Sequence, residues 1–204
     1  MARHEEALIT EAVILGGITL PSGALARRLI NGTSATNIYN DINFVLTTLK
    51  NNGTTVQDSG PSGFGTALEL DVGEFFTVNP QMPHEWIAGT TVFPHLHIMP
   101  QTDVEFTIGW KTSYSIADIG GVFPLGTIDA ATETVIPAGS QWKHLLINLP
   151  AAGIDMSAFA GTSTVLQLKH ELDSCTGGTA ADAHIIGYDV HYRWGGSPVP
   201  YISA

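Results

Sequence analysis

Apolar and polar side chains alternate at every second position over long stretches of this chain. The longest stretch covers residues 104–116, and its even positions read Val104, Phe106, Ile108, Trp110, Thr112, Tyr114 and Ile116. A segment with this period buries one face and exposes the other, which is typical of strands in antiparallel sheets. The pattern therefore predicts β-strands rather than helices.

Similar alternation recurs from residue 67 onward. It predicts seven strands, at residues 67–72, 74–78, 92–99, 104–116, 142–149, 164–172 and 184–194, with two weaker candidates at 122–128 and 132–136. Seven to nine short strands separated by turn residues indicate an all-β fold with two packed antiparallel sheets, specifically a jelly-roll-like β-sandwich. Residues 155–159 are expected to form one helical turn.

The segment 34–50 is ambiguous. Its apolar residues fall near a helical spacing, with Ser34 or Thr36 available as a cap. The run 44–49, followed by Asn51-Asn52-Gly53 and then 54–56, is also a β-hairpin signature. Composition favours strands. The Gly- and Ser-rich residues 58–65 predict a linker between this part and the main body.

The expected organisation is a single sandwich domain at residues 35–194. Residues 1–34 show no clear period and contain Gly16-Gly17 and Pro21, so they predict an extended N-terminal arm. Such arms often become ordered only against a neighbouring subunit. Residues 195–204, rich in Gly and Pro, form a C-terminal tail.

Charge narrows the possible partners. The chain has 8 basic and 19 acidic residues, a net charge of −11. Phosphate backbones are bound by clustered Lys and Arg, and no such cluster is present, so neither nucleic acid nor an anionic membrane surface is expected as a partner. No apolar run approaches the roughly 20 residues of a membrane span. A single cysteine, Cys175, excludes an intrachain disulfide.

Histidines supply the strongest hint of chemistry. His95 and His97 are two residues apart on a predicted strand, so both rings face the same side, as in half of a metal site. Gly89 with this pair, and Pro137-Ala138-Gly139 with His144, resemble the two motifs of the cupins, which are jelly rolls that bind a metal through two or three His and a Glu.

The cupin pattern fails at its carboxylate. Gln101 and Thr102 stand where the ligand Glu should be. A packed, hydrogen-bonded pair is therefore favoured, and no metal or other cofactor and no catalytic residue is expected. A cupin-like metal-binding enzyme, with ligands His95, His97 and His144, stays as an alternative.

A second resemblance covers more of the chain. Residues 82–100 read MPHEWIAGTTVFPHLHIMP, which resembles a signature of tailed-phage virion proteins, roughly MPHxWxxGTxxxPHxH. Weaker matches follow this pattern at residues 39–44, 104–119, 143–145 and 187–192, so the resemblance covers about 35–194. It implies a β-sandwich found in phage particles without assigned catalysis. By this resemblance five histidines form a cluster that maintains the fold: His84, His95, His97, His144 and His191.

The resemblance and the acidity together suggest a place in the particle. A compact acidic β domain with an apolar arm suits a cement or decoration protein, made in the bacterial cytoplasm and bound to the capsid exterior. Its expected partners are the major capsid protein and further copies of itself, a homotrimer being favoured. A tail, fibre or baseplate component is the alternative.

The arm hypothesis yields a first prediction. Deleting residues 1–30 is expected to release the protein from particles while the sandwich stays folded, because the arm would reach across to a neighbour. Particle occupancy and circular dichroism of the free protein measure the two effects. Full occupancy of the truncated chain would refute this role.

Overall fold

The computed structural model describes residues 14–15, 18–19, 39–45, 50–63, 65–129, 131–159, 161 and 163–194. Within the expected arm, only two short paired strands are described, β1 (Ile14–Leu15) and β2 (Ile18–Thr19). The rest of the arm and the expected tail lie outside the described residues.

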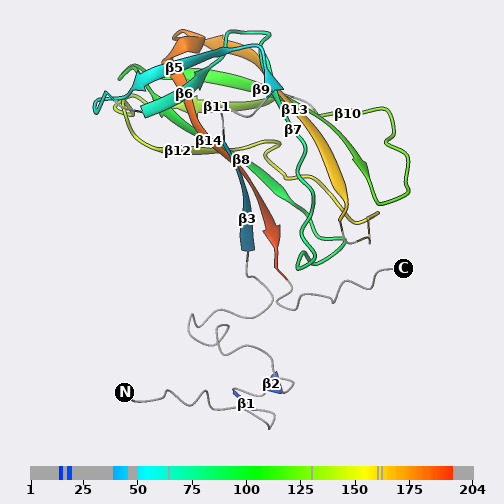
Figure 1. Cartoon of the computed structure of the whole chain (residues 1–204). Helices are drawn as coiled ribbons and strands as arrows, with labels where there is room; N and C mark the ends of the chain where they lie inside the picture. Colours follow the sequence, from blue (N-terminus) through cyan, green and yellow to red (C-terminus); the bar gives the residue numbers. More distant parts are fainter. Residues whose placement is uncertain are drawn as a thin grey trace.

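Two six-stranded antiparallel sheets form a β-sandwich, as the alternation predicts (Figure 1). The β8–β14 sheet has the order β12 (Leu145–Asn148), β8 (Phe93–Pro100), β14 (Ala183–Arg193), β6 (Gly65–Glu69) and β5 (Thr54–Ser59), and β3 (Tyr39–Phe44) also pairs with β14. The β9–β13 sheet has the order β10 (Thr127–Ile128), β9 (Phe106–Ala117), β13 (Val165–Thr176), β7 (Phe75–Val78) and β4 (Lys50–Asn51), and β11 (Thr132–Ile136) also pairs with β9.

The core lies between the inner faces of the two sheets. Phe76 and Trp110 of the β9–β13 sheet lie edge to face, with ring centroids 6.4 Å apart. Phe76 also lies edge to face with Tyr188 of the β8–β14 sheet, at 5.3 Å. All three rings are buried. Burial of such large apolar surfaces is the main stabilising contribution to the sandwich.

A polar chain runs through this core. The imidazole of His170, fully buried, is hydrogen bonded to the Thr112 hydroxyl (Nδ1–Oγ1 3.0 Å) and to the Tyr188 hydroxyl (Nε2–Oη 2.8 Å). Both ring nitrogens are therefore satisfied, as buried polar groups need to be. Because Tyr188 belongs to the opposite sheet, the chain connects the two layers.

The hairpin expected around Asn51-Asn52-Gly53 is wrong, although the preference for strand is confirmed at Tyr39–Phe44. β4 pairs with β7, whereas β5 pairs with β6, so the chain passes from one sheet to the other at Gly53. A Cβ at Gly53 would lie 2.4 Å from the backbone oxygen of Glu69, so only glycine fits this crossing.

The linker expected at residues 58–65 is also wrong. β5 extends to Ser59 and β6 begins at Gly65, so these residues close a hairpin inside the β8–β14 sheet. Their Gly and Ser content reflects a turn, not a domain boundary.

Two other expectations need correction. Of the weak strand candidate 122–128, only Thr127–Ile128 is a strand, and the preceding residues form a loop. Residues 155–159 form a turn rather than a helical turn, and the Phe159 N–H donates to the Met156 carbonyl (2.9 Å). A short 3-10 helix, η3, is described instead at Ala180–Asp182. Across the described ranges, no helix has the length and hydropathy to cross a bilayer.

The buried His170 yields a prediction on pH and stability. Burial lowers the pKa of His170 from 6.5 to about 3, so the unfolded chain binds a proton at a higher pH than the folded one. This contribution to stability is complete above pH 6.5 and is lost as pH falls from 6.5 toward 3. Between pH 7 and pH 5 the loss is about 2 kcal/mol.

Urea unfolding of His170→Gln should therefore lose less free energy between pH 7 and pH 5 than the wild type does. Thr112→Val, which keeps the buried imidazole, is the matched control and should retain the wild-type pH dependence. Identical pH dependence in wild type and His170→Gln would contradict this role of His170.

Candidate functional site

The outer face of the β8–β14 sheet collects most of the histidines. In β8 the residues Leu96 and Ile98 point into the core, so His95 and His97 point to the opposite face. In β14 the core residues Tyr188 and Val190 alternate with outward-facing residues in the same way. The pleat therefore turns His95 and His97 away from the core, onto the surface that β14 shares.

Strand register brings the outward residues of neighbouring strands together. Asp189 of β14 is directly opposite His95 of β8, and His191 is directly opposite Asp41 of β3. Leu146 of β12 is opposite His97, which places the preceding His144 beside the same ring. Residues opposite each other in an antiparallel pair share a face, so three strands, β3, β8 and β14, contribute to one cluster together with the residue just before β12.

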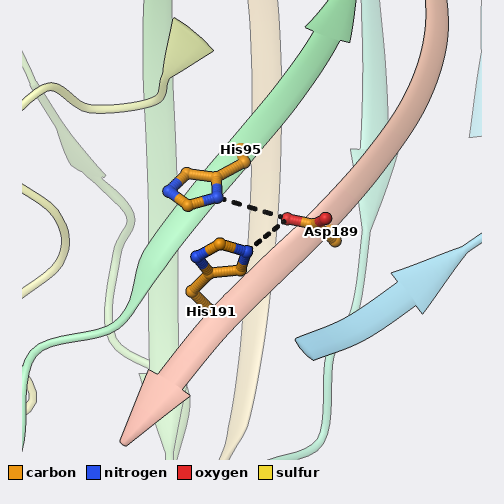
Figure 2. A group of neighbouring side chains, drawn as sticks. All are labelled: His95, Asp189 and His191. Carbon is orange, nitrogen blue, oxygen red and sulfur yellow. Dashed lines mark ion pairs between the residues drawn. The ribbon is translucent and has the colours of Figure 1, made fainter. Parts of the chain in front are cut away.

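The Asp189 carboxylate is the centre of this cluster (Figure 2). Its Oδ2 accepts a hydrogen bond from His97 Nε2 (2.8 Å). Its Oδ1 faces two other rings, His95 Nδ1 at 3.4 Å and His191 Nε2 at 3.7 Å. One carboxylate thus lies against three imidazoles.

Two further contacts extend the cluster outward. His144 Nε2 lies 2.6 Å from His97 Nδ1, so one of these two nitrogens donates a hydrogen bond to the other. On the other side, His191 Nε2 lies 2.7 Å from Asp41 Oδ1. The His95 and His191 rings meet edge to face, with centroids 3.7 Å apart.

Two residues of the histidine cluster, Asp189 and His95, are almost completely buried. Asp189 is 5% exposed and His95 is 7% exposed, although both belong to the outer face of their sheet. Asp189 Oδ1 and His95 Nδ1 are buried without a hydrogen-bond partner. Their 3.4 Å separation is too long for a good hydrogen bond, so a charged oxygen and a ring nitrogen face each other nearly unpaired.

The surroundings of Asp189 and His191 shift the pKa values of both groups. Burial raises the pKa of Asp189, but the adjacent His95 ring, the hydrogen bond from His97 and the positive charges that His97 and His191 can carry outweigh it, so the pKa lies below its ordinary value. Burial lowers the pKa of His191, as do nearby His95 and His97, and these effects outweigh the raising effect of Asp41 and Asp189. Near neutral pH the cluster therefore contains an ionised carboxylate beside a neutral His191.

The predicted histidines divide between two places. His95, His97, His144 and His191 come together in this cluster, whereas His84 lies in the loop after β7 and is hydrogen bonded to Ser163 (Nε2–Oγ 2.9 Å). The group expected from the cupin motifs, His95, His97 and His144, is therefore present on one face, but the two nitrogens of His97 are hydrogen bonded to His144 and to Asp189.

Sequence reasoning missed the two carboxylates, Asp189 and Asp41. A signal for Asp189 was available, because Asp189 and His191 have the same two-residue spacing as His95 and His97 and therefore also share a face. Among the described residues, His95, Asp189 and His191 form a group with the spacing of metal ligands, because one ligand atom of each lies within 4.8 Å of the others. Asp41 and the pairing of β3 with β14 carry no such signal.

The cluster yields a prediction on stability. Asp189→Ala removes the acceptor of the His97 hydrogen bond and leaves His97 Nε2 unpaired, so the unfolding free energy should fall by about 1–3 kcal/mol. Urea denaturation in the presence of a chelator measures this effect independently of any metal.

Asp41→Ala is the matched control. Its side chain is 42% exposed, so the same change should cost less than about 1 kcal/mol. Equal losses in the two variants would show that Asp189 is not the centre of the cluster.

No protein-family model matches the chain, and no curated protein sequence matches it significantly. Solved structures with a related arrangement of strands include a galactose complex of exo-beta-1,3-galactanase from Phanerochaete chrysosporium (13% identity, TM-score 0.38, covering 74% of this chain and 29% of that one). They also include infectious bursal disease virus, Gx strain (15% identity, TM-score 0.37, covering 80% and 34%).

A third is the CBM36-1 domain of a multidomain xylanase from the hindgut metagenome of Trinervitermes trinervoides, with 16% identity and a TM-score of 0.33, covering 79% of this chain and 100% of that domain. The chain spans about a third or less of the length of the galactanase and virus chains. The neighbours thus include viral and carbohydrate-related proteins, and with TM-scores below 0.5 they carry no weight in choosing between functions.

Proposed function

We propose that this chain is a structural protein of a bacteriophage particle and acts as a cement protein on the outside of the capsid. The observation that carries the proposal is a loop that is hydrogen bonded to the sandwich and has exposed apolar side chains, residues 118–126, here called the apolar loop. It connects β9 to β10 at the side of the sandwich (Figure 1).

The apolar loop exposes large apolar side chains to water, which is energetically unfavourable in an isolated monomer. Leu125 is 99% exposed and Val122 is 89% exposed, and Ile119 and, in the adjacent β10, Ile128 are also largely exposed. A concentration of exposed apolar residues on a small region is typical of a contact site for another protein.

Hydrogen bonds hold the apolar loop in place. The Ser115 hydroxyl of β9 donates to the Pro124 carbonyl (2.8 Å), and Gly121 N–H donates to the Asp118 carbonyl (2.9 Å). The Asp118 carboxylate accepts a hydrogen bond from the Thr164 hydroxyl. Because the backbone is tied to the sandwich in this way, the exposed side chains are presented in a preorganised position, which reduces the entropic cost of binding.

A small hollow lies beneath the apolar loop, and its size favours a role in protein contact rather than in substrate binding. Its volume is about 140 Å³, and Tyr114, Pro124 and Phe159 are among its lining residues. Ligand pockets usually measure roughly 300–1,000 Å³. This hollow is of a size to accept one side chain of a partner.

Charge and the sequence resemblance give the proposal its particular form. A net charge of −11 suits the outside of a shell better than its genome-facing side. The resemblance of residues 82–100 to the virion signature supports a phage particle. The proposed partners are the major capsid protein and two further copies of this chain, because a closed trimer presents one contact to several equivalent sites.

The number of copies per particle tests the proposal and separates it from the tail alternative. Quantitative mass spectrometry of purified virions should find the chain at a large fraction of the abundance of the major capsid protein. An abundance comparable to that of tail proteins would assign it to the tail, and absence from virions would reject both assignments.

The apolar loop yields its own prediction. Val122→Asp places a charge in the proposed contact, where burying a valine contributes about 1.5–3 kcal/mol, so the affinity for particles should fall by about tenfold or more. Binding of the purified variant to particles that lack the protein measures this effect.

Val72→Asp is the matched control, because Val72 is also exposed but lies in the turn between β6 and β7. Both variants should keep the wild-type unfolding temperature. Equal binding by Val122→Asp and wild type would remove the apolar loop from the interface.

A further inference from the structure

We propose that His95, Asp189 and His191 bind one divalent transition-metal ion, of the kind represented by Zn²⁺. The ligand atoms are His95 Nδ1, Asp189 Oδ1 and His191 Nε2, which come from the adjacent strands β8 and β14 (Figure 2). The site would be structural, and it stands independently of the proposed role in a phage particle.

Ligand spacing fits a tetrahedral ion. Zn²⁺ binds His nitrogen and carboxylate oxygen at about 2.0–2.2 Å, so two ligand atoms on a tetrahedral ion lie about 3.3–3.5 Å apart. Asp189 Oδ1 lies 3.4 Å from His95 Nδ1 and 3.7 Å from His191 Nε2. All three atoms lie within 4.8 Å of one another, so the two ring nitrogens need to approach each other by at most about 1.5 Å to complete the geometry.

Two of the three ligand atoms are buried and unsatisfied. Asp189 Oδ1 and His95 Nδ1 have no hydrogen-bond partner, and their residues are more than nine-tenths buried. An unpaired buried carboxylate oxygen is costly, and such a group in a folded protein points to a missing partner. A cation between the two atoms would satisfy both at once.

Neighbouring residues orient the ligands in the way that metal sites require. Asp189 uses Oδ2 to accept from His97 Nε2, which leaves Oδ1 directed at His95 and His191. His144 in turn is hydrogen bonded to His97 (2.6 Å). Supporting hydrogen bonds of this kind fix the orientation of ligands and strengthen their hold on the ion.

A fourth ligand is close by. Asp41 Oδ1 lies 2.7 Å from His191 Nε2, closer than two ligands of one tetrahedral ion. The Asp41 side chain is 42% exposed and so has room to rotate, either to join the ion or to leave the position to water. With Asp41 bound, the ion would tie β3 to β8 and β14.

Ligand chemistry selects the class of ion. Two imidazole nitrogens suit Zn²⁺, Co²⁺, Ni²⁺ and Cu²⁺. Mg²⁺ and Ca²⁺ prefer shells of oxygen atoms. The site should therefore discriminate strongly against the two alkaline-earth ions.

Titration calorimetry of the full-length chain, stripped with a chelator and titrated with Zn²⁺, tests the proposal. The expected result is one high-affinity equivalent of Zn²⁺ and a raised unfolding temperature, with no such effect of Mg²⁺ or Ca²⁺. His97→Ala should weaken binding by about 10–100-fold, as for other supporting residues, and His191→Ala should weaken it more.

His84→Gln is the matched control, because it also removes an imidazole but lies outside the cluster, and it should bind as the wild type does. His191→Ala is the decisive variant, since its partly exposed side chain can be removed without opening the core. Absence of Zn²⁺ binding by the wild type, undiminished binding by His191→Ala, or equal loss in His84→Gln would each overturn the site.

Discussion

The antiparallel register of β14 on β8 is the constraint on which both the core and the histidine cluster depend. Opposed residues share a face, so placing Asp189 opposite His95 also places Tyr188 opposite Leu96. One pair belongs to the cluster and the other to the core. A slip of one residue would turn Asp189 and His191 into the core and Tyr188 out of it, so hydrophobic burial of the inner face also enforces the polar geometry of the outer face.

Core burial and polar satisfaction are coupled in this sandwich. His170 is tolerated in the core because Thr112 and Tyr188 satisfy both of its ring nitrogens. Asp189 and His95 are nearly as buried, yet each keeps one unpaired atom. His170 is therefore a self-sufficient part of the scaffold, whereas Asp189 and His95 leave two polar atoms that a cation could pair, as proposed above.

The two features proposed as functional lie on different sheets. The histidine cluster covers the outer face of the β8–β14 sheet and joins strands of the same chain, whereas the apolar loop extends from the β9–β13 sheet and has exposed side chains available to a partner. A metal ion in the cluster would reinforce the fold, and the apolar loop would make the external contact.

The local sequence was sufficient to predict the strands that have one apolar and one polar face. The two-residue period predicts β9, β13 and β14 and the sandwich itself, because a half-buried strand must alternate. It also places His95 and His97 on one face. Tertiary structure decided the rest: β4 and β5 separate into different sheets because Gly53 allows a close crossing beside Glu69, which no local hairpin signal encodes. Asp41 reaches His191 only because β3 pairs with β14, across about 150 residues of chain, and pairing over such a distance depends on packing rather than on neighbouring residues.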